Sequence, residues 1–166
     1  MRDHVDLRRD AWAKELPDVD TRGMAVLGRA RWITRRVRPP IEATFARHGL
    51  DTGEFDVLTT LLRAGPPYRL RPTELFTGLM ISSGGLTDRL ARLEKAGLIG
   101  RSRSGSDGRS LLVHLTDKGK TTAEAAFRED MAVEARLLES LTDGERDQLA
   151  ALLTKLALSL DKEDEG

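Results

Sequence analysis

Hydrophobic residues recur at helical spacing through the first third of the chain. One stripe has apolar residues three or four positions apart: Val26, Ala30, Ile33, Val37, Ile41 and Phe45. This spacing is the period of one face of an α-helix. A shorter amphipathic segment over residues 6–16 ends before Pro17. Because each proline removes a helical hydrogen bond, Pro39-Pro40 predicts a break or sharp kink in the long helix near Arg38.

The middle of the chain begins with a helix predicted over residues 51–64. Asp51 and Glu54 have the spacing of a capping box at its start, and a Gly-Pro-Pro sequence follows its end. A short helix is predicted to open at Pro72, and a second one to cover residues 84–96.

A hairpin is predicted to follow these helices. Residues 98–101 and 111–115 have the character of two short strands, and the turn over residues 104–109 contains Asp107-Gly108, which favours a tight hairpin connection. Helix, turn, helix and hairpin in this order make a winged helix-turn-helix, which places one helix in a DNA groove and a loop beside it.

The C-terminal third predicts two more helices. Thr116 is in position to cap the first, and Thr142 and Glu145 form a capping box for the second. The last helix is rich in leucine: Leu149, Leu152, Leu153, Leu156 and Leu160. The outer helices have more apolar surface than the small central module can cover, which predicts a two-fold homodimer; a monomeric bundle is the alternative.

The second predicted helix of the module has one apolar and one polar face. Leu86, Leu90 and Leu93 fall at i, i+4 and i+7 and are expected to face the core. The polar arc and the turn before it supply the predicted DNA contacts: Ser82, Ser83, Gly84, Thr87, Asp88, Arg92 and Lys95. The small residues allow close approach of the backbone, and the cations neutralise phosphates. An ordinary solvated helix face is the alternative.

The predicted hairpin has arginines near its tip. Arg103 and Arg109 flank the turn, and an arginine on a short ribbon suits the narrow, electronegative minor groove. Asp107 is close enough in sequence to hold the guanidinium of Arg109. A surface hairpin with solvent-facing arginines is the alternative.

Composition narrows the class of protein. The 166 residues include no cysteine, so disulfides, thiolate metal sites and cysteine nucleophiles are excluded. No apolar run approaches the length of a membrane span, and the first residues lack the apolar core of a signal peptide, so a cytoplasmic location and no membrane partner are expected. The net charge of zero conceals an excess of +4 over residues 69–116 and of −6 over residues 117–166.

Catalytic chemistry is not predicted. His4, His48 and His114 are far apart in sequence, and neither a G-x-S-x-G elbow nor a phosphate-binding loop is present. No metal site and no cofactor are therefore expected, and the positive excess on the central module favours nucleic acid as the partner. A winged helix used for protein–protein contact is the competing function, and a flat salt dependence of duplex binding would favour it.

The fold class predicted by these elements is mainly α with a small β-hairpin wing, a winged helix-turn-helix module plus a helical dimerisation region from both chain ends. Five divisions are expected: an extra N-terminal helix (1–17), the N-terminal part of the dimerisation helix (18–50), the winged helix-turn-helix DNA-binding domain (51–116), C-terminal dimerisation helices (117–160) and an acidic tail (161–166).

Five segments in order carry a family resemblance: residues 70–75, 81–82, 93–99, 107–110 and 115–119. From about residue 24 to residue 160 the chain resembles the MarR family of bacterial transcription regulators. The resemblance implies an obligate two-fold dimer on a pseudo-palindromic operator of double-stranded DNA. It also implies repression relieved by a small molecule, often aromatic or anionic. Gly100 departs from the charged residue common before the wing arginine.

A finer resemblance concerns the urate-responsive branch of this family, which has an extra N-terminal helix. Its ligand residues match Trp12, Asp56, Arg63 and Arg89 of this chain. The resemblance implies that an anionic heterocycle such as urate pairs with Arg89, stacks on Trp12 and repels Asp56, which moves the recognition helix. Other roles stay open: macrodipole pairing for Asp56 and Arg63, a core or interface position for Trp12, a phosphate contact for Arg89, and other carboxylates or phenols as the ligand.

Overall fold

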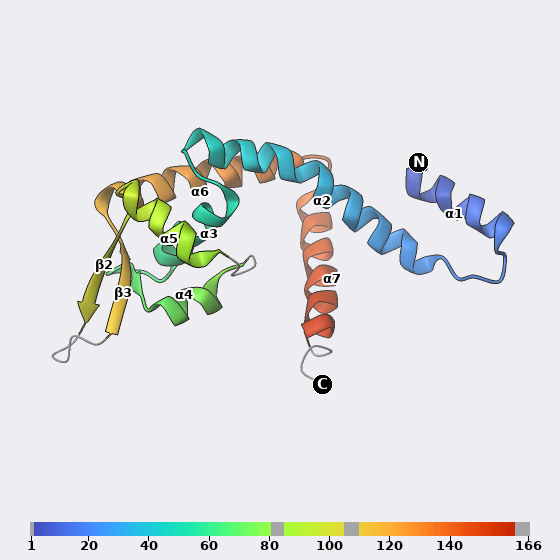
Figure 1. Cartoon of the computed structure of the whole chain (residues 1–166). Coiled ribbons are helices and arrows are strands. Elements are labelled where there is room, and N and C mark those ends of the chain that lie inside the picture. Colours follow the sequence, from blue (N-terminus) through green and yellow to red (C-terminus); the bar gives the residue numbers. More distant parts are fainter. Residues whose placement is uncertain (1, 81–84, 105–109, 162–166) are drawn as a thin grey trace.

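The computed structural model describes residues 2–80, 85–104 and 110–161. These residues form seven α-helices and three short strands, which Figure 1 shows in chain order. The bounds are α1 His4–Glu15, α2 Arg22–Arg47, α3 Thr52–Arg63, β1 Arg69–Leu70, α4 Pro72–Gly78, α5 Leu86–Lys95, β2 Ile99–Ser104, β3 Ser110–Leu115, α6 Asp117–Leu137 and α7 Asp143–Asp161. The mainly helical fold with a hairpin is confirmed.

The sheet is one strand larger than the predicted hairpin. Strand β3 lies between β2 and β1 and pairs antiparallel with both. In the hairpin Ile99 is opposite Leu115, and on the other edge Leu70 is opposite Val113. Strand β1 has only two residues and is defined by its pairing with β3. Neither its length nor an alternation of apolar and polar residues could therefore predict it from the sequence.

The core of the molecule lies in the module formed by α3, α4, α5 and the sheet. Helix α3 passes through its middle, and Val57, Leu58 and Leu61 have no exposed surface. Residues of the neighbouring elements close around it, including Leu75 of α4 and Leu93 of α5. The apolar face expected for the second helix of the module is therefore confirmed, because Leu90 and Leu93 are both buried.

The predicted helix caps are present. Asp51 accepts a hydrogen bond from the backbone N–H of Glu54 at 2.7 Å, and the Glu54 carboxylate accepts one from the N–H of Asp51 at 2.9 Å. Thr116 accepts from the N–H of Gly119 at 2.9 Å at the start of α6. Each cap satisfies N–H groups that a helix leaves unpaired in its first turn, which fixes where these helices begin.

Helix α2 is continuous at the position near Arg38 where a break or a sharp kink was expected, so the break is contradicted. The helix runs from Arg22 to Arg47 through Pro39 and Pro40. The two prolines leave the carbonyls of Arg35 and Arg36 without their helical donors. Both residues are exposed, so water can serve those carbonyls and the helix need not end.

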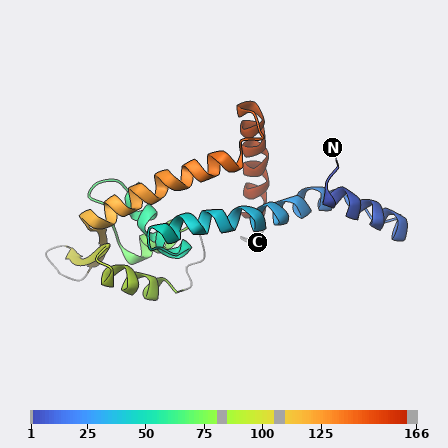
Figure 2. The same cartoon turned by 90° about the horizontal axis from the view of Figure 1, so that it is seen from above.

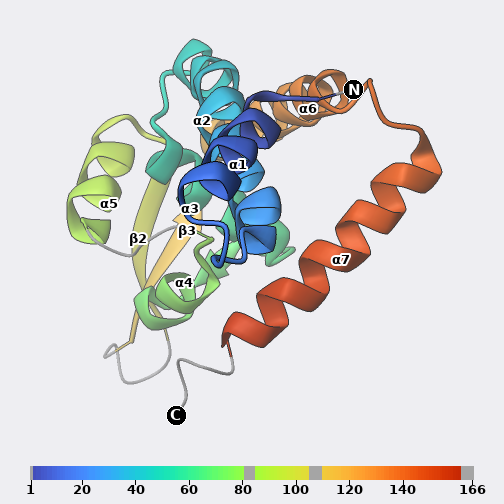
Figure 3. The same ribbon diagram turned by 90° about the vertical axis from the view of Figure 1, so that its right-hand side faces the viewer.

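The long helices extend beyond the module. Helices α2 and α6 lie side by side, as Figure 2 shows from above. Helix α1 packs on the outer half of α2, where Val5 is buried against Gly28 and Arg29 pairs with Asp3 and Asp6. Helix α7 stands apart from the other elements in Figure 3 and has no buried residue.

No helix in the described ranges is both long and apolar enough to cross a membrane. Within the same residues, no group of three or more His, Asp or Glu side chains could hold a metal ion.

Candidate nucleic-acid interface and interior cavity

Helix α5 presents the polar face predicted for nucleic-acid contact. Its apolar residues Leu90 and Leu93 point into the core, whereas Thr87, Asp88 and Lys95 are exposed. This face is therefore accessible, and its contact with DNA stays a prediction. Three further predicted contacts lie outside the described residues: Ser82, Ser83 and Gly84.

Arg92 is bound to α3, although the sequence suggested a phosphate contact for it. Its Nε lies 2.7 Å from Oε1 of Glu54, and its Nη2 lies 2.7 Å from Oδ2 of Asp51. The hydrogen bond to Glu54 is the main reason that the pKa of Arg92 lies above its ordinary value. Because Asp51 and Glu54 also cap α3, the same two carboxylates fix the start of α3 and the position of α5.

Arg89 also turns toward α3. Its guanidinium lies over Gly53, at a place that a Cβ on Gly53 would occupy. Gly53 is buried in the first turn of α3. Because Gly53 has no Cβ, the Arg89 side chain can lie directly against the α3 backbone.

The wing is connected to α5 by an ion pair that sequence analysis missed. Arg101 of β2 lies 3.1 Å from Glu94 of α5. The predicted contact Arg103 is exposed on β2. Asp107 and Arg109, the predicted tip residues, lie outside the described residues. The signal for the Arg101–Glu94 pair is opposite charge on adjacent elements, which becomes specific only once the elements are placed.

A cavity of about 700 Å³ lies between α3 of the module and the long helices α2 and α6. Its wall is mainly apolar, with the stacked rings of Phe45 and Phe55 3.9 Å apart. Four charged side chains line it: Asp56, Arg63, Asp130 and Glu134. Two of the four predicted ligand residues, Asp56 and Arg63, are thus brought together.

Asp56 and Arg63 hold the last residue of α4 and the backbone just after it. Oδ2 of Asp56 accepts a hydrogen bond from the N–H of Met80 at 2.8 Å, and Arg63 donates to the carbonyl oxygen of Gly78. Met80 itself lines the cavity. The cavity wall is therefore bonded to the segment that leads from α4 toward α5.

Asp130 is a buried carboxylate that sequence analysis missed. It is 4% exposed, and among the described residues its Oδ1 has no hydrogen-bond partner. Burial raises its pKa from 3.8 to about 6, with the neighbouring charge of Glu134 as the smaller cause. Its position is visible in the sequence only as one member of the inward stripe of α6: Ala123, Ala126, Asp130 and Val133.

Comparison with known proteins identifies the protein family. A sequence model described as MarR family matches residues 48–110. The transcriptional regulator PecS of Dickeya dadantii is 34% identical over 145 residues, which cover 87% of both chains. The chain belongs to the MarR family of transcription regulators.

Solved MarR-family structures have the same fold. Wild-type MarR of Escherichia coli superposes with a TM-score of 0.63 at 26% identity, over 78% of this chain and 96% of that one. Sco3205 of Streptomyces coelicolor, solved in complex with DNA, superposes with a TM-score of 0.74 at 23% identity, over 86% and 89% of the two chains.

In this MarR-family chain the other two predicted ligand residues are not at the cavity wall. Trp12 of α1 is 47% exposed and lines a shallow pocket of about 310 Å³ with Leu16 and Val19. Helix α1 lies along the outer half of α2, away from α3 (Figure 1). Arg89 contacts Gly53 but is not among the residues that line the cavity.

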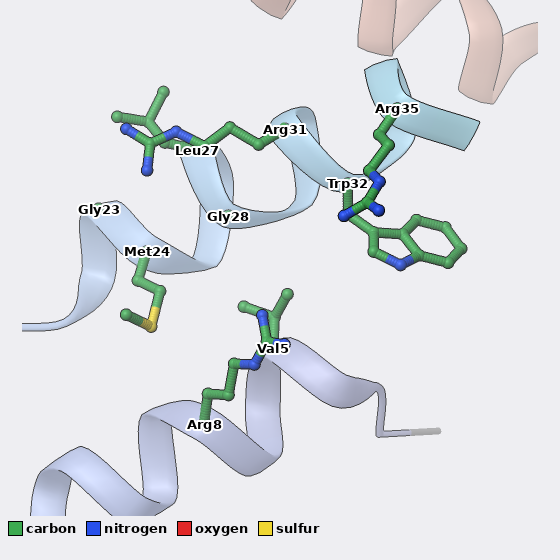
Figure 4. Close-up of a pocket in the computed structure, with 9 residues that line it drawn as sticks. All are labelled: Val5, Arg8, Gly23, Met24, Leu27, Gly28, Arg31, Trp32 and Arg35. Atoms are coloured by element: carbon green, nitrogen blue, oxygen red, sulfur yellow. The ribbon is translucent and has the colours of Figure 1, made fainter. Parts of the chain in front are cut away.

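A second cleft, which the sequence did not suggest, lies between α1 and α2. It measures about 490 Å³ and is lined by Arg8, Arg31 and Arg35 around an apolar floor with Trp32. Figure 4 shows Arg8 extending from α1 and the other two arginines along α2. No ion pair of these three arginines is present in the part of the chain that the structure describes. The cleft gives this regulator a cationic surface on its outer helices.

Proposed function

We propose that this MarR-family regulator represses transcription by binding a pseudo-palindromic operator as a homodimer, and that a small molecule in the cavity releases it. The observation that carries the proposal is the arrangement of α5. Leu90 and Leu93 are buried, its polar face is exposed, and the wing with Arg103 lies at the same end of the molecule (Figure 1). This is the arrangement by which a winged helix-turn-helix contacts DNA.

The outer helices support the homodimer. Helix α7 exposes six leucines, of which Leu152 and Leu158 are about three-fifths exposed at 60% and 58%. The outer half of α2 exposes Val26 and Ile33. Apolar surface of this extent, on helices from both ends of the chain, favours burial against a second copy.

The contacts of Asp56 and Arg63 support the response to a ligand. Both side chains line the cavity; Arg63 binds the last residue of α4, and Asp56 binds the backbone just after it. A ligand that competes for either side chain changes the restraint on the segment leading to α5. It acts on DNA affinity only if it binds the two arrangements with different affinity.

Salt-dependent DNA binding tests the function. A duplex selected from a random pool should show half-sites about 10 base pairs apart, and its affinity should fall steeply with salt. Replacing Lys95 or Arg103 by alanine should reduce the salt slope by about one each. Thr87→Ala should change sequence preference more than salt slope.

Lys14→Ala on α1 is the matched control, because it removes an exposed cation far from the proposed DNA-binding face and should leave the slope unchanged. Salt-insensitive binding would instead support a winged helix used for protein–protein contact. A monomer at all concentrations in light scattering would contradict the homodimer.

Urate is the effector that the branch resemblance names, with Trp12, Asp56, Arg63 and Arg89 as its residues. Trp12 reaches the cavity in this proposal only by a movement of α1 or from the second copy. Urate titrated into the protein–DNA complex should release the DNA and quench Trp12 fluorescence, with Trp32→Phe used to isolate that signal. No release and no quenching at millimolar urate would exclude urate, and would leave the DNA-binding function standing.

A further inference from the structure

Asp130 has a buried carboxylate oxygen that no hydrogen-bond donor among the described residues reaches. A buried carboxylate oxygen without a hydrogen bond is unfavourable, and native structures contain few of them. Asp130 is 4% exposed, lines the cavity, and its Oδ1 has no partner in the described part of the chain. The cavity wall therefore holds a buried acceptor without a donor from the described residues.

The other charged groups at the cavity do not serve that oxygen. Glu134, on the same helix, is a second acceptor of like charge. From α3, Asp56 accepts from Met80 and Arg63 donates to Gly78. The residues that α2 contributes, Ile41 and Phe45, are apolar. A donor for Asp130 has to come from outside this set.

The rest of the wall suits a flat, apolar body. Phe45 and Phe55 are stacked, and Phe127, Met80 and Met131 also line the cavity, with Thr52 and Thr59 as its uncharged polar residues. Aromatic and methionine side chains pack well against a planar ring, and a few placed polar groups then set its orientation. Asp130 of α6 and Arg63 of α3 are two such groups, an acceptor and a donor on different helices.

We propose that Asp130 is the recognition residue for the effector, and that the cavity takes a planar aromatic molecule that directs an N–H donor at Asp130 and an acceptor edge toward Arg63. This inference rests on the proposed function and names the chemistry of its effector. Amides and imides on a ring have both the donor and the acceptor, whereas an amidine, protonated at neutral pH, has the donor alone. A ring whose only polar group is a carboxylate lacks it and adds a like charge beside Asp130, Glu134 and Asp56.

Three probes of nearly equal shape test the proposal: benzamide, benzamidine and benzoate. Calorimetry on the full chain at pH 7.5 should show benzamide and benzamidine binding about tenfold or more tightly than benzoate, because only they donate to the carboxylate. Asp130→Asn replaces one acceptor oxygen by an NH₂ donor. The preference for benzamide over benzoate should then fall to about onefold or reverse.

Two further variants keep the test decisive. Glu124→Gln, on the same helix but outside the cavity lining, should leave the order of the three probes unchanged. Asp130→Leu removes the acceptor altogether and should also abolish the preference for benzamide, which covers the case in which Asp130→Asn does not fold.

Three results would overturn the inference: benzoate binding the wild-type chain as tightly as benzamide, an unchanged preference in both Asp130 variants, or no binding of any probe at millimolar concentration. Operator affinity is measured on the same samples. Loss of probe selectivity with intact, salt-dependent DNA binding rejects this inference alone, whereas absent DNA binding rejects the proposed function.

Discussion

Helices α3 and α7 differ in how much of their apolar surface this chain buries. Eight of the twelve residues of α3 are buried, and three of its side chains have no exposed surface at all. Helix α7 is longer, with nineteen residues and a richer supply of leucine, yet none of its residues is buried. Most of the stability of a helix in a protein comes from packing of its apolar face, which α7 does not have within this chain.

This difference separates two sources of stability: packing within one chain, and packing against a second chain. The module around α3 has its own core, so its folding free energy should not vary with protein concentration. The leucines of α7 contribute only when another surface covers them. Under the proposed homodimer, dilution should affect α7 and leave the module folded.

The largest expected effect comes from one leucine in each helix. Leu61→Ala should destabilise the chain by about 2–5 kcal/mol at every concentration, because it opens a cavity in a closed core. Leu153→Ala should lower the free energy of unfolding by less. Its effect should be larger at protein concentrations where dimer and monomer coexist. Denaturant unfolding at two protein concentrations, read by circular dichroism, measures both.

Equal concentration dependence for the two variants would break the comparison between α3 and α7. Leu50→Ala is the control within the core, since Leu50 is buried outside α3 and should behave like Leu61.

A smaller effect on stability is expected at Asp130, whose charged carboxylate is buried at the cavity wall. Its pKa is raised to about 6, so between pH 4 and pH 6 the folded chain holds a proton that the unfolded chain loses. Stability from this group is therefore highest at low pH and falls as pH rises through 6. Asp130→Asn should stabilise the chain by up to about 3 kcal/mol above pH 7 and have little effect near pH 4. Thermal melting across this range tests it.

The charged groups near Asp130 define the control for that experiment. Glu134 on α6, and Asp56 and Arg63 on α3, line the same cavity. Glu124→Gln, outside the lining, should show no such pH-dependent gain. A gain that increases toward acid pH would have the wrong sign for a buried carboxylate.

The smallest effect is expected where α1 packs on α2. Hydrogen bonds from Arg29 and from the backbone lower the pKa of Asp3 to about 2. The stabilisation is present above pH 4 and is lost as pH falls toward 2. Asp3→Asn should therefore lower the melting temperature slightly at pH 7 and hardly at pH 2, because the pair is partly exposed. Asp18→Asn, an exposed carboxylate of the adjacent loop, is the matched control and should change nothing at either pH.

Local signals explain what the sequence predicted well. The capping box of Asp51 and Glu54 and the spacing of Leu90 and Leu93 depend on neighbours within one helix, and the structure contains both. Of the two outcomes expected at Pro39-Pro40, a break or a sharp kink, the break was wrong, because helix propensity does not say whether the freed carbonyls reach water.

Tertiary placement explains what the sequence missed. The burial of Asp130 arises from the packing of α6 against α2 and α3, and a pattern along α6 alone does not reveal it. The link from Asp56 to Met80 joins residues 24 positions apart and needs the fold to bring them together. The predicted meeting of Trp12 with Asp56 has the same requirement, and α1 places Trp12 on the outer helices.

The resting position of Arg89 depends on the absence of a single methyl group. Its guanidinium occupies the space that a side chain at Gly53 would fill. Alanine at that position would overlap the guanidinium and force the Arg89 side chain to move. A mutation at this buried glycine, which contacts neither DNA nor effector in the proposed mechanism, would therefore be a source of altered regulation in genetic screens.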